Sequence, residues 1–203
     1  MNRLRIVGVV AGVAVIFAAG IAWYEIRRGF SARAKPSSIE VLVASTARRL
    51  AVPSANRRRR NPFPASPETF RAGMEHFADH CAVCHGNDGS GDTMFGKGLY
   101  PKPPDLRARQ TQNKGDGELY YTIENGVRLS GMPAFGERAG GDDVVTWHLV
   151  LFIRHLPALT SAELSEMERF NPKSEKERQE ELEEEEFLRG GNSQAPDGNS
   201  HHH

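Results

Sequence analysis

Cysteine is scarce in this sequence, with two in 203 residues. That number excludes a disulfide-rich scaffold, which needs several bridges. Net charge is also absent, because 26 Lys and Arg balance 26 Asp and Glu. This balance argues against a uniformly basic nucleic-acid-binding protein. Only 38% of the residues are hydrophobic and the mean hydropathy is −0.52, which excludes a polytopic membrane protein. The length allows roughly one domain with appendages.

The zero net charge conceals a strong asymmetry along the chain. Residues 1–60 carry 12 Lys and Arg against two acids, a net charge of +10, whereas residues 161–190 carry −6. Residues 61–160 lie between them at −3. A globular core is therefore expected in the middle of the chain, between a basic and an acidic end.

A long uncharged run extends from Ile6 to Tyr24 near the N-terminus. Extended to Ile26, it would form about 31 Å of helix, which matches the hydrocarbon core of a bilayer. Trp23 and Tyr24 at one end are typical of an interfacial aromatic belt. We interpret residues 1–28 as an uncleaved membrane anchor, because the run exceeds the apolar core of a signal peptide. A cleaved signal peptide, with a cleavage site near Gly20, and a buried globular helix are the alternatives.

Residues 29–66 contain four prolines and no sustained hydrophobic period. We interpret them as a linker with one short ordered piece around residues 39–43. The four consecutive arginines at 57–60 have three interpretations: a solvated charge cluster, a contact with anionic headgroups, or a contact with an acidic partner.

Two capping boxes, beginning at Thr160 and Ser174, predict two helices in an acidic tail over residues 161–189. The tail is interpreted as a solvated helix, a docking surface for a basic partner, or a partner of the arginines at 57–60. Residues 190–203 are expected to be disordered. The terminal His201, His202 and His203 are native or a tag, and they are left out of the metal argument.

Both cysteines lie in one motif, Cys81-Ala82-Val83-Cys84-His85. C-x-x-C-H is the attachment signature of c-type haem. The two thiols add to the porphyrin vinyl groups, and the adjacent histidine becomes the proximal iron ligand. A thioredoxin-like site would need a βαβ pattern, and none is found. A zinc site would need a second Cys/His pair; only His76 and His80 are near.

Two amphipathic helices are predicted around this motif. The first spans residues 67–80, with Gly73 and Phe77 on one face, and the second spans residues 143–156, capped by Gly141 or Asp142 and ended by Pro157. A third is expected over residues 116–125, capped by Asp116, with Leu119, Tyr120 and Ile123 facing the core. The segment 67–160 resembles a class I monohaem cytochrome c, an all-α fold. In that family the first and last helices cross at matching glycine and aromatic positions.

The sixth iron ligand is assigned to Met132, in Gly131-Met132-Pro133. A methionine between glycine and proline lies in a stiffened, extended loop, and this stretch resembles the distal-ligand loop of the family. Met94, in a glycine-rich loop, is the chief rival, and a packed loop methionine is the remaining alternative. The four central histidines are interpreted as surface or partly buried residues: His76, His80, His148 and His155.

The resemblance also implies a proline-rich loop on the proximal side of the haem, and residues 99–106 fit it. A backbone carbonyl at Pro103 or Pro104 would accept the ring N–H of His85. Arg107 is a candidate for the haem propionates, as are Lys102 and Arg109.

These features together predict a periplasmic, membrane-tethered electron carrier with one covalent haem c. It would exchange electrons with redox partner proteins at the bacterial inner membrane, would bind no nucleic acid and would not itself be an enzyme. Two alternatives stay open. One is a haem subunit of a larger membrane oxidoreductase, and the other is a ligand-binding sensor or enzyme with a displaceable Met132.

Overall fold

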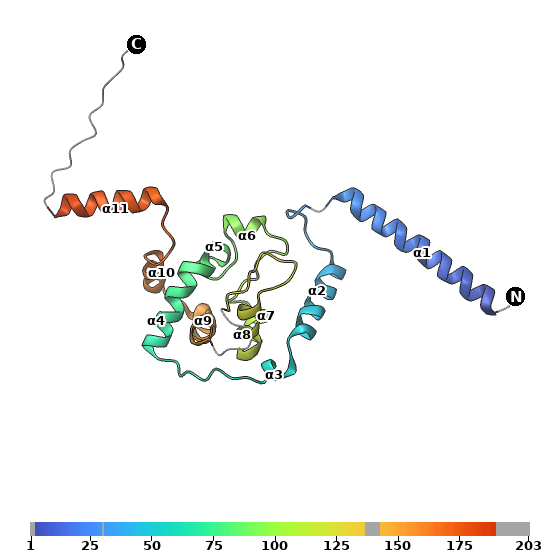
Figure 1. The fold of residues 1–203 in the computed structure, drawn as a ribbon, viewed down its shortest axis with the longest axis horizontal. Helices are drawn as coiled ribbons and strands as arrows, with labels where there is room; N and C mark the ends of the chain where they lie inside the picture. Colours follow the sequence, from blue (N-terminus) through green and yellow to red (C-terminus); the bar gives the residue numbers. More distant parts are fainter. Residues whose placement is uncertain (1–2, 30, 137–142, 190–203) are drawn as a thin grey trace, which may run out of the picture.

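A computed structural model describes residues 3–29, 31–136 and 143–189, which excludes the segment 190–203. All regular secondary structure among the described residues is helical, as predicted, and these residues contain no strand (Figure 1). The helices in chain order are α1 (Arg3–Arg28), α2 (Ser38–Ala51), α3 (Ser54–Arg57), α4 (Pro67–His76), the π-helix η1 (Phe77–Cys81), α5 (Ala82–His85), α6 (Met94–Gly98), α7 (Arg109–Gln112), α8 (Asp116–Asn125), α9 (Val144–His155), the 3₁₀-helix η2 (Leu156–Ala158), α10 (Ser161–Glu168) and α11 (Glu175–Leu188).

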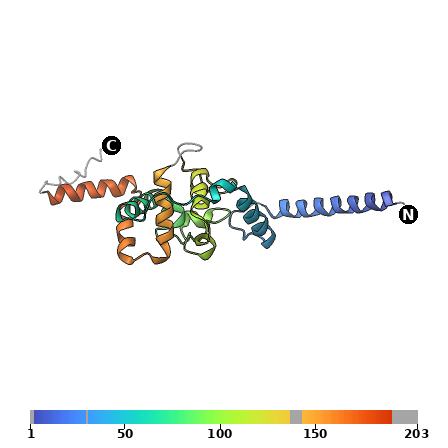
Figure 2. The same cartoon turned by 90° about the horizontal axis from the view of Figure 1, so that it is seen from below.

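Helix α1 is the expected apolar helix near the N-terminus. The stretch Arg5–Arg28 is long and apolar enough to cross a bilayer, with a mean hydropathy of 2.5 over its best window, and none of that window is buried against the rest of the chain. Figures 1 and 2 show it extending away from the packed body. A helix this apolar and this exposed is unfavourable in water, so its length and surface support membrane anchoring.

The core is built around the crossing of α4 and α9. Phe77 and Phe152 are fully buried, and their ring centroids lie 5.2 Å apart. Gly73 of α4 lies directly against the backbone of His148, and a Cβ there would lie 3.0 Å from the Cβ of Phe152. Because glycine has no side chain, the two helix backbones approach closely at this point, as the sequence predicted.

Substituting Gly73 by alanine should therefore destabilise the protein. The added methyl overlaps the backbone of α9, and overpacking of this kind typically costs about 1–3 kcal/mol. We expect a lower thermal midpoint in near-ultraviolet circular dichroism of the detergent-solubilised protein. Gly98→Ala is the matched control, because a Cβ at Gly98 meets nothing within 4 Å. Equal midpoints for the two variants would contradict the proposed close packing.

Helix α8 packs against α9 through the predicted residues. Leu119, Tyr120 and Ile123 are all buried, and the Tyr120 ring stacks on Trp147 with centroids 4.2 Å apart. The cap differs from the prediction: Gly115 is the N-cap, and Asp116 is the first helical residue. The carboxylate of Asp116 instead accepts hydrogen bonds from Arg154 of α9, at 3.0 and 2.8 Å.

Helix α9 begins one residue later than the predicted caps. Asp143 is the N-cap, and its side chain accepts a hydrogen bond from the Val145 backbone N–H at 2.9 Å. The expected caps, Gly141 and Asp142, lie outside the described residues. At the other end, Pro157 lies in η2, where the chain leaves the α-helix.

The segment 29–66 is more ordered than the linker we expected. Instead of a short piece around residues 39–43, it forms the 14-residue helix α2, which starts with a capping box between Ser37 and Glu40. The chain after α2 then packs on the helical body. Val52 is buried, and Asn61 Nδ2 donates a hydrogen bond to the Trp147 carbonyl at 2.8 Å. Burial of Val52 and the hydrogen bond of Asn61 therefore hold the chain after α2 on the helical body.

Both predicted capping boxes of the acidic tail are present, and they begin α10 and α11. Met167 of α10 is fully buried, so the packed body continues beyond residue 160. Helix α11 has no buried residue. Its ion pairs in the described structure are local and involve Lys173, Lys176, Arg178 and Arg189.

Candidate functional site

The C-x-x-C-H motif occupies the end of a helical run that begins at Pro67. Helix α4 passes into the π-helix η1, which ends at Cys81, and α5 then carries Cys84 and His85. Wider π-turns inside α-helices often occur at functional sites. The sequence pattern of α4 predicted one uninterrupted helix, and nothing in it indicated the wider turn. The turn brings the two cysteines and the histidine to one end of the run.

Both cysteines are unpaired and half-buried. The thiol of Cys81 packs against the hydrophobic core. Burial, with a smaller contribution from the neighbouring Cys84, raises the pKa of Cys81 to about 12. At neutral pH this thiol is therefore protonated, which gives it little of the thiolate character of a redox-active or metal-binding cysteine.

The imidazole of His85 is largely enclosed. Burial lowers its pKa, and the backbone carbonyl of Pro104 partly offsets this effect. Nδ1 is buried, and the Pro104 carbonyl lies near the ring without completing a hydrogen bond of good geometry. Of the two prolines predicted for this role, Pro104 is the one whose carbonyl lies near His85. In a ligating histidine the ring nitrogen that does not bind the metal usually has a partner of this kind.

The loop between α5 and α6 holds the proline-rich segment beside His85. The Gly91 N–H donates to the His85 carbonyl at 2.7 Å, and the Leu106 N–H donates to the Gly89 carbonyl at 2.8 Å. Gly91 has a φ of +75°, and a Cβ there would lie 2.7 Å from the Pro103 carbonyl oxygen. Glycine is required at this contact both for its backbone conformation and for the close approach. Pro103 therefore positions the loop, and Pro104 follows it toward His85.

Met132 lies in a short loop that is tied back to α8. The Val127 N–H donates to the Met132 carbonyl at 3.1 Å, and the Phe135 N–H donates to the Ile123 carbonyl at 3.1 Å. Within this loop Leu129 has a φ of +61° and is 92% exposed. A left-handed backbone is uncommon for a residue other than glycine, and such strain often occurs at functional sites. The sequence contains no glycine or asparagine at this position that could have predicted the turn.

The methionines differ sharply in exposure. Met132 is half-buried and packs against the edge of the core. Met94, its rival in the sequence, is 83% exposed on α6. Met74 and Met167 are enclosed in the core, at 2% and 0% exposure. Among the methionines of the described residues, Met132 alone combines partial burial with a place at the surface of the core.

Arg107 has partners other than a propionate in this structure. Its guanidinium forms ion pairs with Asp105 at 2.9 Å and with Asp88 at 3.1 Å. These contacts connect the two loops around His85. The alternative cations, Lys102 and Arg109, are exposed.

The central histidines lie on the surface or are partly buried. The rings of His76 and His80 lie 4.7 Å apart at a tilt of 51°. His148 contacts the edge of Phe63, and His155 lies 3.1 Å from a Glu163 oxygen. In the parts of the chain that the structure describes, no three His, Cys, Asp or Glu side chains converge as a metal site.

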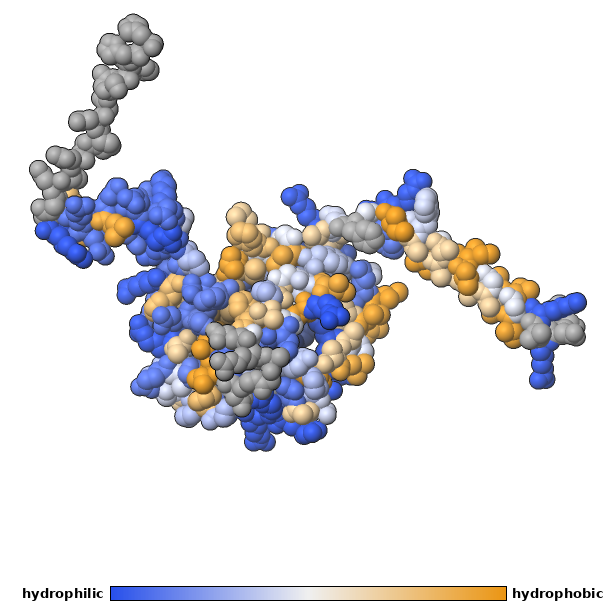
Figure 3. All heavy atoms as spheres, viewed as in Figure 1, coloured by the Kyte–Doolittle hydropathy of each residue, from blue (hydrophilic) through white to orange (hydrophobic). Residues whose placement is uncertain are grey.

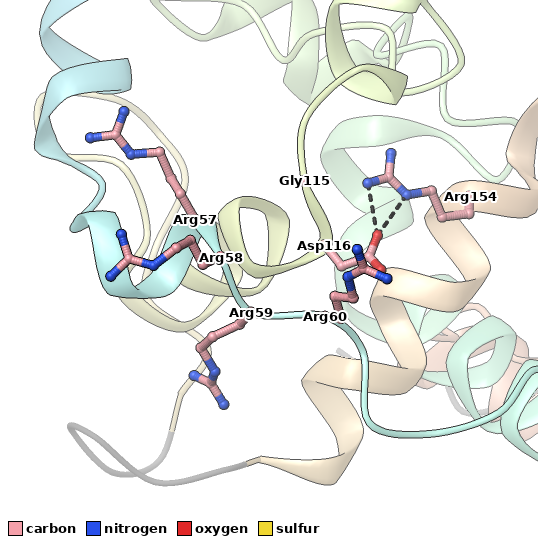
Figure 4. A pocket seen from close by; sticks show the side chains of 7 residues that line it. All are labelled: Arg57, Arg58, Arg59, Arg60, Gly115, Asp116 and Arg154. Carbon is pink, nitrogen blue, oxygen red and sulfur yellow. Dashed lines mark hydrogen bonds and ion pairs between the residues drawn. The ribbon is translucent and has the colours of Figure 1, made fainter.

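The four arginines at 57–60 surround an open pocket of about 730 Å³ (Figure 4). Its other lining residues are Gly115, Asp116 and Arg154. Arg59 packs against aromatic side chains, with its guanidinium carbon 4.6 Å from the Tyr120 ring and 5.0 Å from the Trp147 ring. Arg59 therefore has a packing role that the sequence did not indicate, whereas Arg57, Arg58 and Arg60 are exposed.

The residues of the motif fit a covalently attached haem c. Two unpaired thiols lie one helical turn apart, the following histidine is half-buried with a buried Nδ1, and the Pro104 carbonyl lies near its ring. Such a carbonyl is the usual outer partner of a ligating histidine. Met132 is half-buried at the edge of the core, and a methionine thioether is a standard partner of histidine on haem iron.

The all-helical fold and the C-x-x-C-H turn define a c-type cytochrome domain. Residues 68–153 match the family model of cytochrome c oxidase, cbb3-type, subunit III. The matched segment begins in α4 and ends in α9, so it contains both crossing helices and the motif. The chain therefore contains a c-type cytochrome domain over residues 68–153, together with an N-terminal apolar helix suited to membrane anchoring. Haem c binding and electron transfer follow from this class of domain.

Proposed function

We propose that this protein is a membrane-tethered electron carrier with a single covalent haem c ligated by His85 and Met132. The observation that carries the proposal is the C-x-x-C-H turn, with an enclosed histidine, in a cytochrome domain that also holds a half-buried methionine. When bound, the haem supplies a one-electron ferric/ferrous couple.

Each protein group has a defined task in this proposal. Cys81 and Cys84 hold the porphyrin through thioethers, and His85 supplies the proximal nitrogen. The Pro104 carbonyl orients the imidazole, and Met132 supplies a soft thioether that favours the reduced state and raises the potential. The strained turn at Leu129 and the backbone bonds of residues 127 and 135 keep the Met132 loop in place. A fixed ligand set limits the rearrangement that accompanies electron transfer.

The anchor and the haem chemistry together support a periplasmic location. In bacteria, haem is attached to C-x-x-C-H motifs outside the cytoplasmic membrane. We therefore infer that α1 crosses the inner membrane with its N-terminus inside, and that residues 29–203 lie in the periplasm. A tether confines the haem domain near membrane-bound redox partners and raises its effective concentration for them.

Carbon monoxide tests the carrier proposal directly. The dithionite-reduced protein should show the same visible spectrum before and after addition of CO, because a filled sixth position excludes the gas. Prompt formation of a CO complex would overturn the assignment and would favour a sensor or a haem enzyme with a displaceable Met132.

A second function is favoured by the family match. Because residues 68–153 match an oxidase subunit family, the chain is also a candidate for the haem subunit of a larger membrane oxidoreductase. Extraction from native membranes in a mild detergent separates the two proposals. A complex subunit is expected to elute with other polypeptides at a size well above 22.5 kDa plus detergent, whereas a free carrier is expected to elute alone.

A further inference from the structure

Helix α2 presents an apolar stripe that no part of the described structure covers. Ile39, Leu42, Val43 and Leu50 stand at positions i, i+3, i+4 and i+11, which share one face of a helix. Their exposures range from 61% to 75%. Figure 3 shows apolar residues along the outer edge of the body where α2 lies in Figure 1. Four exposed aliphatic residues on one short helix indicate a contact surface.

Helix α2 contacts the cytochrome domain through Glu40, which lies outside the stripe. The Tyr100 hydroxyl donates a 2.7 Å hydrogen bond to Glu40 Oε1. Ser45 is half-buried, whereas the stripe residues are all exposed. Glu40 also caps α2, because its Oε2 accepts the Ser37 N–H at 2.9 Å. The stripe residues therefore take no part in this contact, and no described residue covers them.

The position of α2 in the chain identifies what can cover the stripe. Nine residues separate the end of α1 at Arg28 from the start of α2 at Ser38. Ten residue steps span at most about 35 Å, so α2 stays close to the surface from which α1 emerges. Basic residues flank the stripe on both sides, at Arg33, Lys35, Arg48 and Arg49. An amphipathic helix with basic flanks is the kind of segment that binds in the headgroup region of a bilayer.

We propose that α2 lies in the interface of the same membrane that α1 crosses, with Ile39, Leu42, Val43 and Leu50 inserted among the lipids. Through the Glu40–Tyr100 hydrogen bond, the membrane-bound helix is connected to the loop that contains Pro103 and Pro104. The membrane contact thus positions the haem domain relative to the bilayer, rather than leaving it free on a flexible linker. The proposal depends on the anchor and is independent of whether Met132 ligates the iron.

An environment-sensitive dye on single cysteines tests this proposal in the full-length holoprotein. Nitrobenzoxadiazole (NBD) is attached to Leu42→Cys on the stripe or, as the matched control, to Ala44→Cys, which is exposed on another side of α2. The proteins are reconstituted in vesicles of phosphatidylethanolamine and phosphatidylglycerol. Dye at position 42 should show blue-shifted emission, strong quenching by doxyl-labelled lipid and weak quenching by iodide. Dye at position 44 should show the reverse pattern of quenching.

Two results would overturn the proposal. Strong iodide quenching and weak lipid quenching at both positions would show that the stripe faces water. Blue-shifted emission at position 42 that neither quencher reduces would show that the stripe is covered by protein, and in this preparation the cover is a second copy of the chain. The emission maximum is measured together with the quenching. A nearby haem lowers the emission intensity but does not change the polarity of the dye's surroundings, which the emission maximum reports.

A second variant separates insertion from local helix packing. In Val43→Cys protein, the added pair Ile39→Gln and Leu42→Gln removes apolar surface from the stripe but retains a helix-compatible sequence. We expect lipid quenching of dye at position 43 to fall and iodide quenching to rise, while the haem spectrum stays unchanged. Unchanged quenching in this variant would contradict insertion of the stripe.

Discussion

Alanine at position 132 is expected to open the sixth coordination position of the haem iron. The reduced Met132→Ala protein should bind CO promptly, whereas the unmodified protein should not. Its reduction potential should fall by on the order of 0.1 V, within the roughly 0.8 V range that axial ligation controls. The physical reason is the loss of a thioether that favours the ferrous state. Visible spectroscopy with and without CO, and a redox titration, measure the two effects.

Met94→Ala is the matched control for this experiment. Met94 is the rival ligand in the sequence, but its side chain is 83% exposed, so its loss should leave both the CO response and the potential unchanged. If Met94→Ala opened the iron and Met132→Ala did not, the ligand assignment would be reversed. If neither variant changed the spectrum, neither methionine would be the ligand.

Removal of both motif cysteines should abolish covalent attachment of the haem. In Cys81→Ala/Cys84→Ala protein, haem retained after denaturation and acid–acetone extraction should fall from nearly all to background, because no thioether remains. Each single variant should keep a large fraction of its haem through the remaining thioether. Haem stain after denaturing electrophoresis measures the retained fraction. Full retention in the double variant would refute attachment of haem through Cys81 and Cys84.

The packed body extends beyond residues 67–160, so the variants are best made in the full chain. Val52 before the crossing helices and Met167 after them are both buried, and Asn61 is bonded to α9. A truncation to residues 67–160 would therefore expose parts of the core. The full chain is the appropriate material for the potential and CO measurements.

The sequence by itself determined the features that depend on local chemistry. C-x-x-C-H specifies haem attachment because two thiols and an adjacent imidazole meet the porphyrin within one helical turn. The capping boxes at Thr160 and Ser174 and the pattern of α9 predicted helices because caps and periodicity act within a few residues. Gly73 indicated a helix crossing, and the crossing lies there. Length and hydropathy alone identify the apolar run of α1.

Only the tertiary structure decided the features that depend on distant partners. Asp116 pairs with Arg154 instead of capping α8, and Arg59 packs on Tyr120 and Trp147 from a segment without a hydrophobic period. The carbonyl of Pro104 lies near the ring of His85, although the two residues are nineteen positions apart in the chain. The apolar stripe of α2 can be interpreted as a contact surface only because the hydrogen bond from Tyr100 to Glu40 shows where α2 meets the domain. These contacts form between segments that are distant in the sequence. Residue patterns within one segment therefore do not predict them.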